Sequence, residues 1–296
     1  MIAFPDISPE IFTITLMGKS LPLRWYSLAV IVGMFLALMI MKQIVARKNL
    51  WRAETPPMNS FQVEIMVFFA LVGILVGGRL GEVIFYHPHY FLENPQDIFR
   101  SWEGGNSFHG GFIGVLLAAY LFCRFHKIPL ASTCDLIAIS AFPGLVLGRI
   151  ANFINVELWG TPTTMPWGVV FPSEAAQLCP AVEGLCARHP SQLYEAGLEG
   201  FCLGLLLLIL AFRGALRFPG LLTGVFFVGY ALARFSVEFF RQAEAQFITL
   251  MNPNGYVIQY NDFGITMGQA LSLPMVFIGL AIIFLSLNQR FLSHNS

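Results

Sequence analysis

The residues best suited to chemistry in this sequence are ionisable side chains embedded in apolar stretches, where a charge is costly and usually functional. The clearest set is Tyr230, Arg234, Glu238 and Arg241, spaced by four, four and three residues. This spacing places all four on one face of a helix. A pair that only joins two helices would account for Arg234 and Glu238, but not for the tyrosine and the second arginine. We therefore predict that the four residues line the wall of a polar pocket.

A second polar group closes another apolar stretch, where Arg149, Asn152 and Asn155 follow one another at intervals of three residues. A guanidinium with two carboxamides can bind an anionic group rich in oxygen. Arginine binds such a group through two parallel hydrogen bonds and stays charged at any relevant pH. A helix end anchored at the membrane interface is the other interpretation. Glu195 and Glu199, four residues apart, open a further stretch.

His109 opens an apolar stretch in which Gly110, Gly111 and Gly114 follow it. Glycines at a helix start let another group approach the backbone closely. The helix N-terminus attracts anions and disfavours a protonated imidazole. A neutral imidazole beside a thiol or a phosphate can act as a general base, although a single histidine is more often structural. For Tyr26, anchoring in the aromatic belt of the membrane is the default interpretation.

The elements that must hold these residues are membrane helices. The 296-residue chain is 56% hydrophobic and 11% charged, against about 25% charged in soluble domains. Continuous apolar stretches near the length of a span occupy 24–46, 62–86, 109–126, 131–148, 192–213, 219–241 and 266–289. Open sheets cannot satisfy their backbone in hydrocarbon, and barrel strands alternate in polarity. We predict an all-α, polytopic inner-membrane protein with about seven transmembrane helices.

Basic residues predict the orientation of these spans, because they favour the cytoplasmic side. They follow the first, third, fifth and seventh stretches, as Arg47, Lys48, Arg52, Arg124, Lys127, Arg213, Arg217 and Arg290. The N-terminus is then outside and the C-terminus cytoplasmic. The loops 87–108 and 149–191 are then periplasmic and form an ordered cap on a single transmembrane domain, 1–296. The polar groups above gather at the outer ends of the spans.

Several functional classes find no support in the composition. A net charge of zero gives no signal for nucleic acid, and no spacing of Cys and His predicts a metal site. The first 23 residues lack the features of a cleavable signal peptide. Cys179 and Cys186 fall in the second outer loop, where a disulfide and two free thiols are both open alternatives. The stretch from Gly73 to Gly78 fits close packing of membrane helices.

The stretch from Gly148 to Gly160, GRIANFINVELWG, resembles the signature G-R-[IL]-x-N-F-[IV]-N-x-E-x-x-G of bacterial prolipoprotein diacylglyceryl transferases. Supporting similarities are the segments HGG at 109–111, GGRLG at 77–81, HPSQLYE at 189–195 and GQALSLPM at 268–275, and the set Tyr230, Arg234, Glu238 and Arg241. The resemblance covers nearly the whole chain. One departure is Val156, where many members have glycine, and it concerns local backbone freedom rather than the polar groups.

The resemblance implies an enzyme, a transferase of the inner membrane whose active site faces the periplasm. Such enzymes move the diacylglyceryl group of phosphatidylglycerol to the lipobox cysteine thiol in the signal peptide of a prolipoprotein. Glycerol 1-phosphate leaves, and the product is a thioether. This transfer is the first step of lipoprotein maturation. The implied partners are phosphatidylglycerol, prolipoprotein signal peptides with a lipobox cysteine and the inner membrane, with no nucleic acid. No metal or organic cofactor is implied.

The resemblance also implies roles for individual residues. His109, Arg149 and Arg234 are the expected catalytic residues: the arginines hold the phosphate, and His109 either accepts the thiol proton or steers the headgroup. The expected substrate-binding residues are Tyr26, Asn152, Glu157, Gly160, Tyr230, Glu238 and Arg241. Because the substrate supplies the nucleophilic sulfur, the chain needs no catalytic cysteine of its own.

Three other functions compete with this interpretation. A transporter or channel would need polar residues at several depths, whereas span centres such as 203–210 and 278–285 are apolar. An intramembrane serine protease could use Ser107, Ser191 or Ser236, but none has a nucleophile-elbow sequence around it. A purely structural membrane protein would not need so many costly charges near the outer face.

Replacing His109 by Gln separates the two roles implied for this residue. If the imidazole is the base, we expect turnover to fall by roughly 100-fold or more, because an amide does not accept a proton near neutral pH. The measurement is the rate of thiol modification at saturating lipid, with the membrane-inserted amount of each protein as control. Near-normal turnover would exclude an obligatory base and leave headgroup steering.

Overall fold

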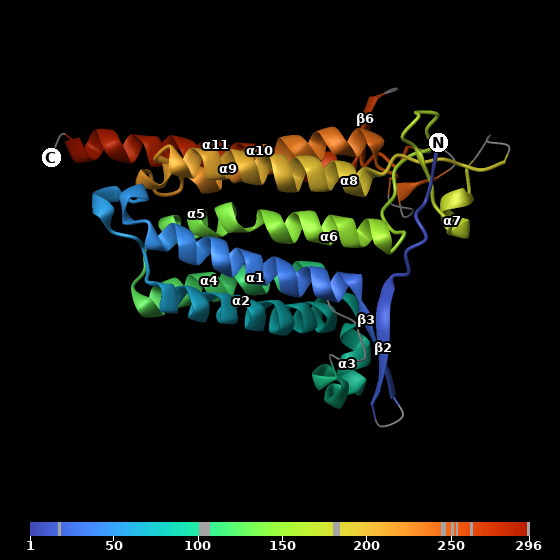
Figure 1. The fold of residues 1–296 in the computed structure, drawn as a ribbon, viewed down its shortest axis with the longest axis horizontal. Helices are drawn as coiled ribbons and strands as arrows, with labels where there is room; N and C mark the ends of the chain where they lie inside the picture. The colour runs from blue at the N-terminus through green and yellow to red at the C-terminus, as the bar shows by residue number, and fades with distance from the viewer. Residues whose placement is uncertain are drawn as a thin grey trace. The chain divides into compact units, whose positions relative to one another are not determined.

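The computed structural model describes residues 1–16, 19–100, 107–179, 184–243, 247–249, 252, 254–260 and 263–294. Helices dominate these residues (Figure 1), as the long apolar stretches predict. The chain divides into two compact units, one formed by Met1–Ala37 with Ile137–Ser296 and the other by Leu38–Leu136. We call them the larger and the smaller unit. The prediction of a single domain over 1–296 stays a prediction.

The larger unit contains most of the helices. They are the first part of α1 (Trp25–Ala46), the end of α5 (Leu130–Ser140), α6 (Phe142–Ile154), α7 (Glu174–Gln177), α8 (Ser191–Glu195), the π-helical segment η6 (Ala196–Cys202), α9 (Leu203–Phe212), α10 (Leu221–Val237) and α11 (Met267–His294). α8, η6 and α9 form one apolar helix of 22 residues. α6 packs against α8 and η6, and α10 packs along α11 (Figure 1).

The smaller unit is built around two helices, α2 (Ser60–Gly81) and α4 (Phe108–His126). Asn59 and Gln62 begin α2 with reciprocal side-chain to backbone hydrogen bonds of 2.9 Å, which satisfy donors that the first helical turn leaves free. α2 continues into the π-helical segment η3 (Glu82–Tyr86), and the short helix α3 (Pro88–Glu93) follows. Short 3₁₀ turns lie in the smaller unit at Lys48–Leu50, Arg52–Glu54 and Pro95–Phe99, and in the larger unit at Ala215–Arg217 and Glu238–Phe240.

The described residues also form three small sheets, which the all-α prediction did not include. β1 (Ile2–Ala3) pairs in parallel with β4 (Val169–Val170), with Ile2 opposite Val169. β2 (Glu10–Leu16) and β3 (Lys19–Arg24) form an antiparallel hairpin, and so do β5 (Ile258–Tyr260) and β6 (Phe263–Ile265). These strands are short and lie outside the long apolar stretches, so hydropathy does not reveal them.

Within the described residues, five helices are long and apolar enough to cross a membrane: Trp25–Ala46, Ser60–Tyr86, Ser191–Phe212, Leu221–Phe240 and Met267–Asn288. A sixth would be the pair α5 and α6, which is bent by 40°. α4 covers the remaining predicted stretch, and its described apolar part, Gly110–His126, is shorter than these helices. A polytopic, mainly helical membrane protein is thus confirmed, while seven spans and their orientation stay predictions.

The fourth predicted span, 131–148, is wrong as a single helix. The chain breaks between α5 and α6, where Pro143 occupies the first turn of α6 and cannot donate a backbone hydrogen bond. α6 then runs to Ile154, beyond the predicted end. Arg149 and Asn152 therefore lie within a helix and not at the start of the outer loop.

Glycines bring α2 and α4 into backbone contact within the smaller unit. A Cβ atom at Gly77 would lie 2.8 Å from the Cα atom of Gly114, and one at Gly110 would lie 2.7 Å from the Cα atom of Gly81. Distances this short exclude a side chain. The close packing predicted for the stretch from Gly73 to Gly78 is confirmed, and α4 supplies the second half of the contact.

Gly77→Leu should destabilise the protein by at least about 1–3 kcal/mol, because the new side chain must push two backbones apart. The matched control is Val76→Leu, since Val76 is the neighbouring residue and is 52% exposed. Thermal unfolding in detergent measures both. Equal melting temperatures for the two variants would show that the close approach of α2 and α4 does not contribute to stability.

Candidate functional site

Three arginines of the larger unit converge on one buried carboxylate, that of Glu195. Arg149 comes from α6, Arg234 from α10, and Arg241 from the segment that follows α10. The Glu195 side chain is 0% exposed. Arg149 Nη1 lies 3.2 Å from its Oε2, Arg241 Nη1 lies 2.6 Å from its Oε1, and Arg234 Nη1 also donates to Oε1. We call these residues, with Glu199 and Glu238, the charged cluster.

Two further glutamates complete the cluster. Glu238 lies 3.0 Å from Arg234 and 3.6 Å from Arg241. Glu199 is held less closely, 3.5 Å from Arg149 and 3.9 Å from Arg234. Tyr230 interacts with both Arg149 and Glu199. Three cations face three carboxylates, so the cluster is formally neutral.

Burial explains why the charges must be paired. Moving an ion out of water costs several kcal/mol, and only close counter-ions and hydrogen bonds return that free energy. The Arg149 and Arg234 side chains keep 21% and 18% of their surface exposed. Each guanidinium has five N–H groups, so donors remain for an anion that reaches the cluster. The glutamates hold the guanidinium groups in place before such an anion binds.

Glu238 owes its position to α11 and the residue before it. Thr266 Oγ1 donates to Glu238 Oε1 over 3.0 Å. A Cβ atom at Gly268 would lie 2.6 Å from the Glu238 carboxyl carbon. Glycine is therefore required for the carboxylate to rest against α11.

A second polar group lies at the end of α6, close to Arg149 in sequence. Asn152 Nδ2 and Asn155 Nδ2 donate to Glu157 Oε1 over 2.7 and 3.3 Å, and Gln192 Nε2 donates to the Glu157 carbonyl over 2.5 Å. Val156, between them, has a φ of 56°, in the left-handed region that glycine adopts freely. This is the position at which the sequence departs from the resembled signature.

Gly160 links the segment that follows α6 to the segment that follows α10, where it forms a β-bridge with Arg241. Its N–H donates to the His189 carbonyl over 2.9 Å, and a Cβ atom there would lie 2.7 Å from the His189 carbonyl oxygen. Its carbonyl accepts from Arg188 Nη1 over 3.2 Å. The close approach leaves no room for a side chain. Burial lowers the pKa of His189, which favours the neutral imidazole near pH 7.

Arg188 is buried and connects the end of α7 with the segment that follows α10. It donates to the carbonyl oxygens of Ala176 and Leu178 over 2.5 and 3.0 Å, and to Gln242 Oε1 over 3.1 Å. Burial lowers its pKa, yet arginine keeps its charge in proteins. Nearby, Cys179 and Cys186 form a disulfide, the alternative that the sequence left open.

Two predicted site residues, Tyr26 and His109, are placed neither in the charged cluster nor beside it or the Asn152–Glu157 group. Tyr26, in α1, is 45% exposed and makes none of the ion pairs described above. His109 is the second residue of α4, in the smaller unit, and its side chain lies outside the described residues. The other predicted site residues lie in the larger unit, in or beside the charged cluster and the Asn152–Glu157 group.

Some residues of the site were not predicted as site residues. They are Glu195, Glu199, Gln192, Thr266 and Gly268. The four-residue spacing of the two glutamates and the segments HPSQLYE and GQALSLPM were the signals that could have identified four of them. Among the described His, Cys, Asp and Glu residues, no group of three could hold a metal ion.

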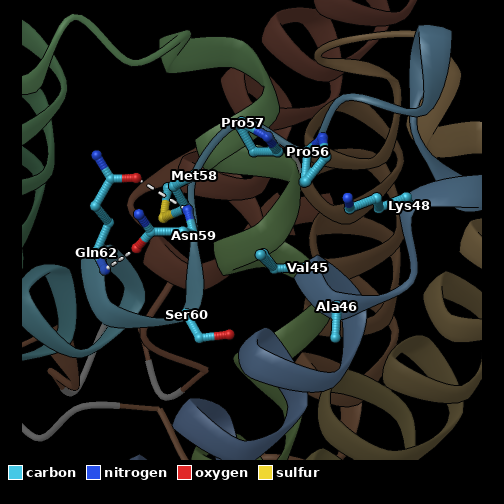
Figure 2. Close-up of a pocket in the computed structure, with 9 residues that line it drawn as sticks. All are labelled: Val45, Ala46, Lys48, Pro56, Pro57, Met58, Asn59, Ser60 and Gln62. Atoms are coloured by element: carbon cyan, nitrogen blue, oxygen red, sulfur yellow. Dashed lines mark hydrogen bonds between the residues drawn. The ribbon is translucent and has the colours of Figure 1, made fainter.

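The hollows in the described part of the chain include two that the charged cluster does not line. One, of about 410 Å³, belongs to the smaller unit (Figure 2), and its lining includes Lys48, Asn59 and Gln62. Asn59 and Gln62 use their polar atoms to cap α2. The other, of about 290 Å³, is an apolar groove between α1 and α6 whose lining includes Trp25 and Ile150. Neither presents a set of catalytic groups.

Comparison with known proteins gives one consistent result. Residues 12–285 match the sequence model of the family described as prolipoprotein diacylglyceryl transferase. A phosphatidylglycerol–prolipoprotein diacylglyceryl transferase of Ruegeria pomeroyi is 54% identical over 281 residues, which cover 95% of each chain. Proteins of the same name from Roseobacter denitrificans and Rhizobium meliloti are 54% and 45% identical, over 95% of this chain and over 96% and 92% of their own lengths.

Glu195→Gln should destabilise the protein by about 3–5 kcal/mol, because three guanidinium groups lose their shared counter-ion in a buried site. Glu199→Gln is the matched control, four residues further along the same helix. Its ion pairs are longer, so we expect a smaller loss. Thermal unfolding in detergent distinguishes them. A larger loss for Glu199→Gln would contradict the central place given to Glu195.

Proposed function

This chain belongs to the prolipoprotein diacylglyceryl transferase family, and from that premise we propose that it transfers diacylglyceryl from phosphatidylglycerol to prolipoproteins. It is a transferase of lipoprotein biosynthesis. The acceptor in our proposal is the lipobox cysteine thiol of the signal peptide, and the second product is glycerol 1-phosphate. The reaction takes place in the inner membrane, with the site toward the periplasm.

The observation that carries the proposal is the convergence of Arg149 and Arg234 on Glu195. A phosphodiester is an anion whose charge grows as its carbon–oxygen bond breaks. Guanidinium groups already in position stabilise that growing charge without reorganising at the moment of reaction. Such preorganised donors typically each contribute about 100- to 1,000-fold in rate.

The bond changes in this proposal balance as a displacement. The substrate sulfur, as thiolate, forms a bond to the glyceryl carbon of the lipid while the bond from that carbon to the phosphate oxygen breaks. The electron pair of the broken bond remains on the phosphate, which leaves as glycerol 1-phosphate. The thiol proton passes to His109, or His109 steers the headgroup and another base accepts the proton.

The neutral charge of the cluster determines how the lipid phosphate would bind. A fourth anion beside three cations can use the N–H groups that remain, and it competes with a carboxylate already present for the others, because its charge is not balanced in the cluster. Glu199 is the best candidate to yield them, since its distances of 3.5 and 3.9 Å are the longer ones to Arg149 and Arg234. Glu195 would keep both arginines in position during this exchange.

The remaining predicted residues support the site in our proposal. Glu238 orients Arg234 and Arg241. Tyr230 interacts with Arg149 and Glu199. Asn152 and Glu157 order the end of α6. Gly160 allows the outer loop to approach the end of α10. Tyr26, exposed near the start of α1, contacts lipid.

Arg149→Ala should abolish transfer, with a loss of about 100-fold or more, because one of the two phosphate-binding cations is gone. Arg149→Lys should recover part of the rate, since an ammonium keeps the charge but not the paired hydrogen bonds. The assay combines purified protein, phosphatidylglycerol and a lipobox peptide, with mass spectrometry of the peptide cysteine.

Arg213→Ala is the matched control, because Arg213 is an exposed arginine at the opposite end of the α8–α9 helix from Glu195. It should retain activity. Near-normal turnover of a correctly folded Arg149→Ala protein would count against the role of Arg149. Ion flux through liposomes without lipid turnover would instead favour a transporter.

A further inference from the structure

Two carboxamide oxygens of the larger unit are buried and have no hydrogen-bond donor among the residues that the structure describes. They are Gln192 Oε1 and Asn155 Oδ1. The Gln192 residue is fully buried, at 0% exposed. Buried polar atoms are nearly always hydrogen-bonded in folded proteins. Two such acceptors near one site therefore point to a partner outside the described chain.

The orientation of both amides follows from their nitrogens. Gln192 Nε2 donates to the Glu157 carbonyl oxygen over 2.5 Å, and Asn155 Nδ2 donates to Glu157 Oε1 over 3.3 Å. Rotating either amide by half a turn would place an oxygen against an oxygen. Each side chain therefore presents its oxygen as an acceptor, and the missing partner must be a donor.

Both amides lie on the cap side of the charged cluster. Gln192 precedes Glu195 by three residues at the start of α8, about one helical turn. Asn155 follows Arg149 by six residues and caps the end of α6. The two helix ends meet at Glu157, which both amides contact. A molecule held by the arginines and extending toward the cap would reach these oxygens.

We propose that Gln192 and Asn155 accept hydrogen bonds from the two hydroxyls of the glycerol headgroup and so select the donor lipid. This inference rests on the proposed function. With the phosphate on Arg149 and Arg234 and the acyl chains in the membrane, the headgroup glycerol extends from the phosphate toward the cap. Each hydroxyl carries one proton to donate, and the two acceptors match the two hydroxyls in number and kind.

The test compares two donors that differ only in those hydroxyls. Phosphatidylpropanol has the same phosphodiester and the same three-carbon headgroup as phosphatidylglycerol, but no hydroxyl. Purified full-length protein receives each lipid with the lipobox peptide, and mass spectrometry of the peptide cysteine gives kcat/KM. We expect the unmodified protein to prefer phosphatidylglycerol on the order of 100-fold or more, because a site built for hydroxyls leaves buried acceptors unpaired with the analogue.

Near-isosteric variants test the two residues. Gln192→Met and Asn155→Leu should each reduce the preference by roughly tenfold or more, chiefly through loss of activity toward phosphatidylglycerol. Ser191→Ala is the matched control: Ser191 is also fully buried and beside Gln192, but its hydroxyl donates to the Leu158 carbonyl over 2.9 Å. Its loss should affect both lipids equally and leave the preference unchanged.

The preference ratio, not the rate, decides the outcome, since general damage to the fold lowers both rates together. Equal use of the two lipids by the unmodified protein would overturn the inference. Folded variants with an unchanged ratio would do the same. Should Gln192→Met not fold, Asn155→Leu and the comparison of lipids still decide. If the unmodified protein transferred diacylglyceryl from neither lipid, the proposed function itself would be overturned, and this inference with it.

Discussion

The buried carboxylate of Glu195 is the interaction on which the site of this protein depends. Three guanidinium groups, brought from α6, α10 and the segment after α10, meet at its two oxygens. Without it, three cations in a largely buried space would repel one another and could not be assembled by packing alone. With it, two of the arginines are held in place and still have donors for an anion.

The surrounding fold makes this convergence sterically possible. α8 and η6 carry Glu195 and Glu199 against α6, so the acidic residues of one helix meet the arginine of the other. Gly268 lets Glu238 rest on α11, and Gly160 lets its segment approach the backbone of Phe240, after α10. The packing thus serves charge pairing: small residues occur where a carboxylate or a backbone must come close.

The polar side chains follow an order along the helices. Arg149 and Glu195 lie further inside the two helices, and the carboxamides of Asn152, Asn155 and Gln192 lie nearer the helix ends that meet at Glu157. In the function we propose, this order matches a phospholipid headgroup, with the phosphate at the cations and the hydroxyls at the neutral acceptors. The enzyme would then use one helix pair, α6 and α8, both to activate the lipid and to recognise it.

The amino-acid sequence by itself determined the helical membrane architecture, because a continuous apolar stretch has only one way to satisfy its backbone in lipid. Local periodicity also placed Tyr230, Arg234, Glu238 and Arg241 on one helical face, and the signature around Arg149 indicated the family. Spacing along one helix, however, is silent about pairing between helices. Arg149 and Arg234 lie 46 and 39 positions from Glu195 in the sequence. Whether they share its carboxylate depends on which helices pack together. The tertiary structure also revealed the break before α6, the short sheets and the left-handed backbone of Val156, which hydropathy does not show. The tertiary structure alone decided the pairing of the arginines with Glu195, because this pairing results from contacts between segments distant in the chain.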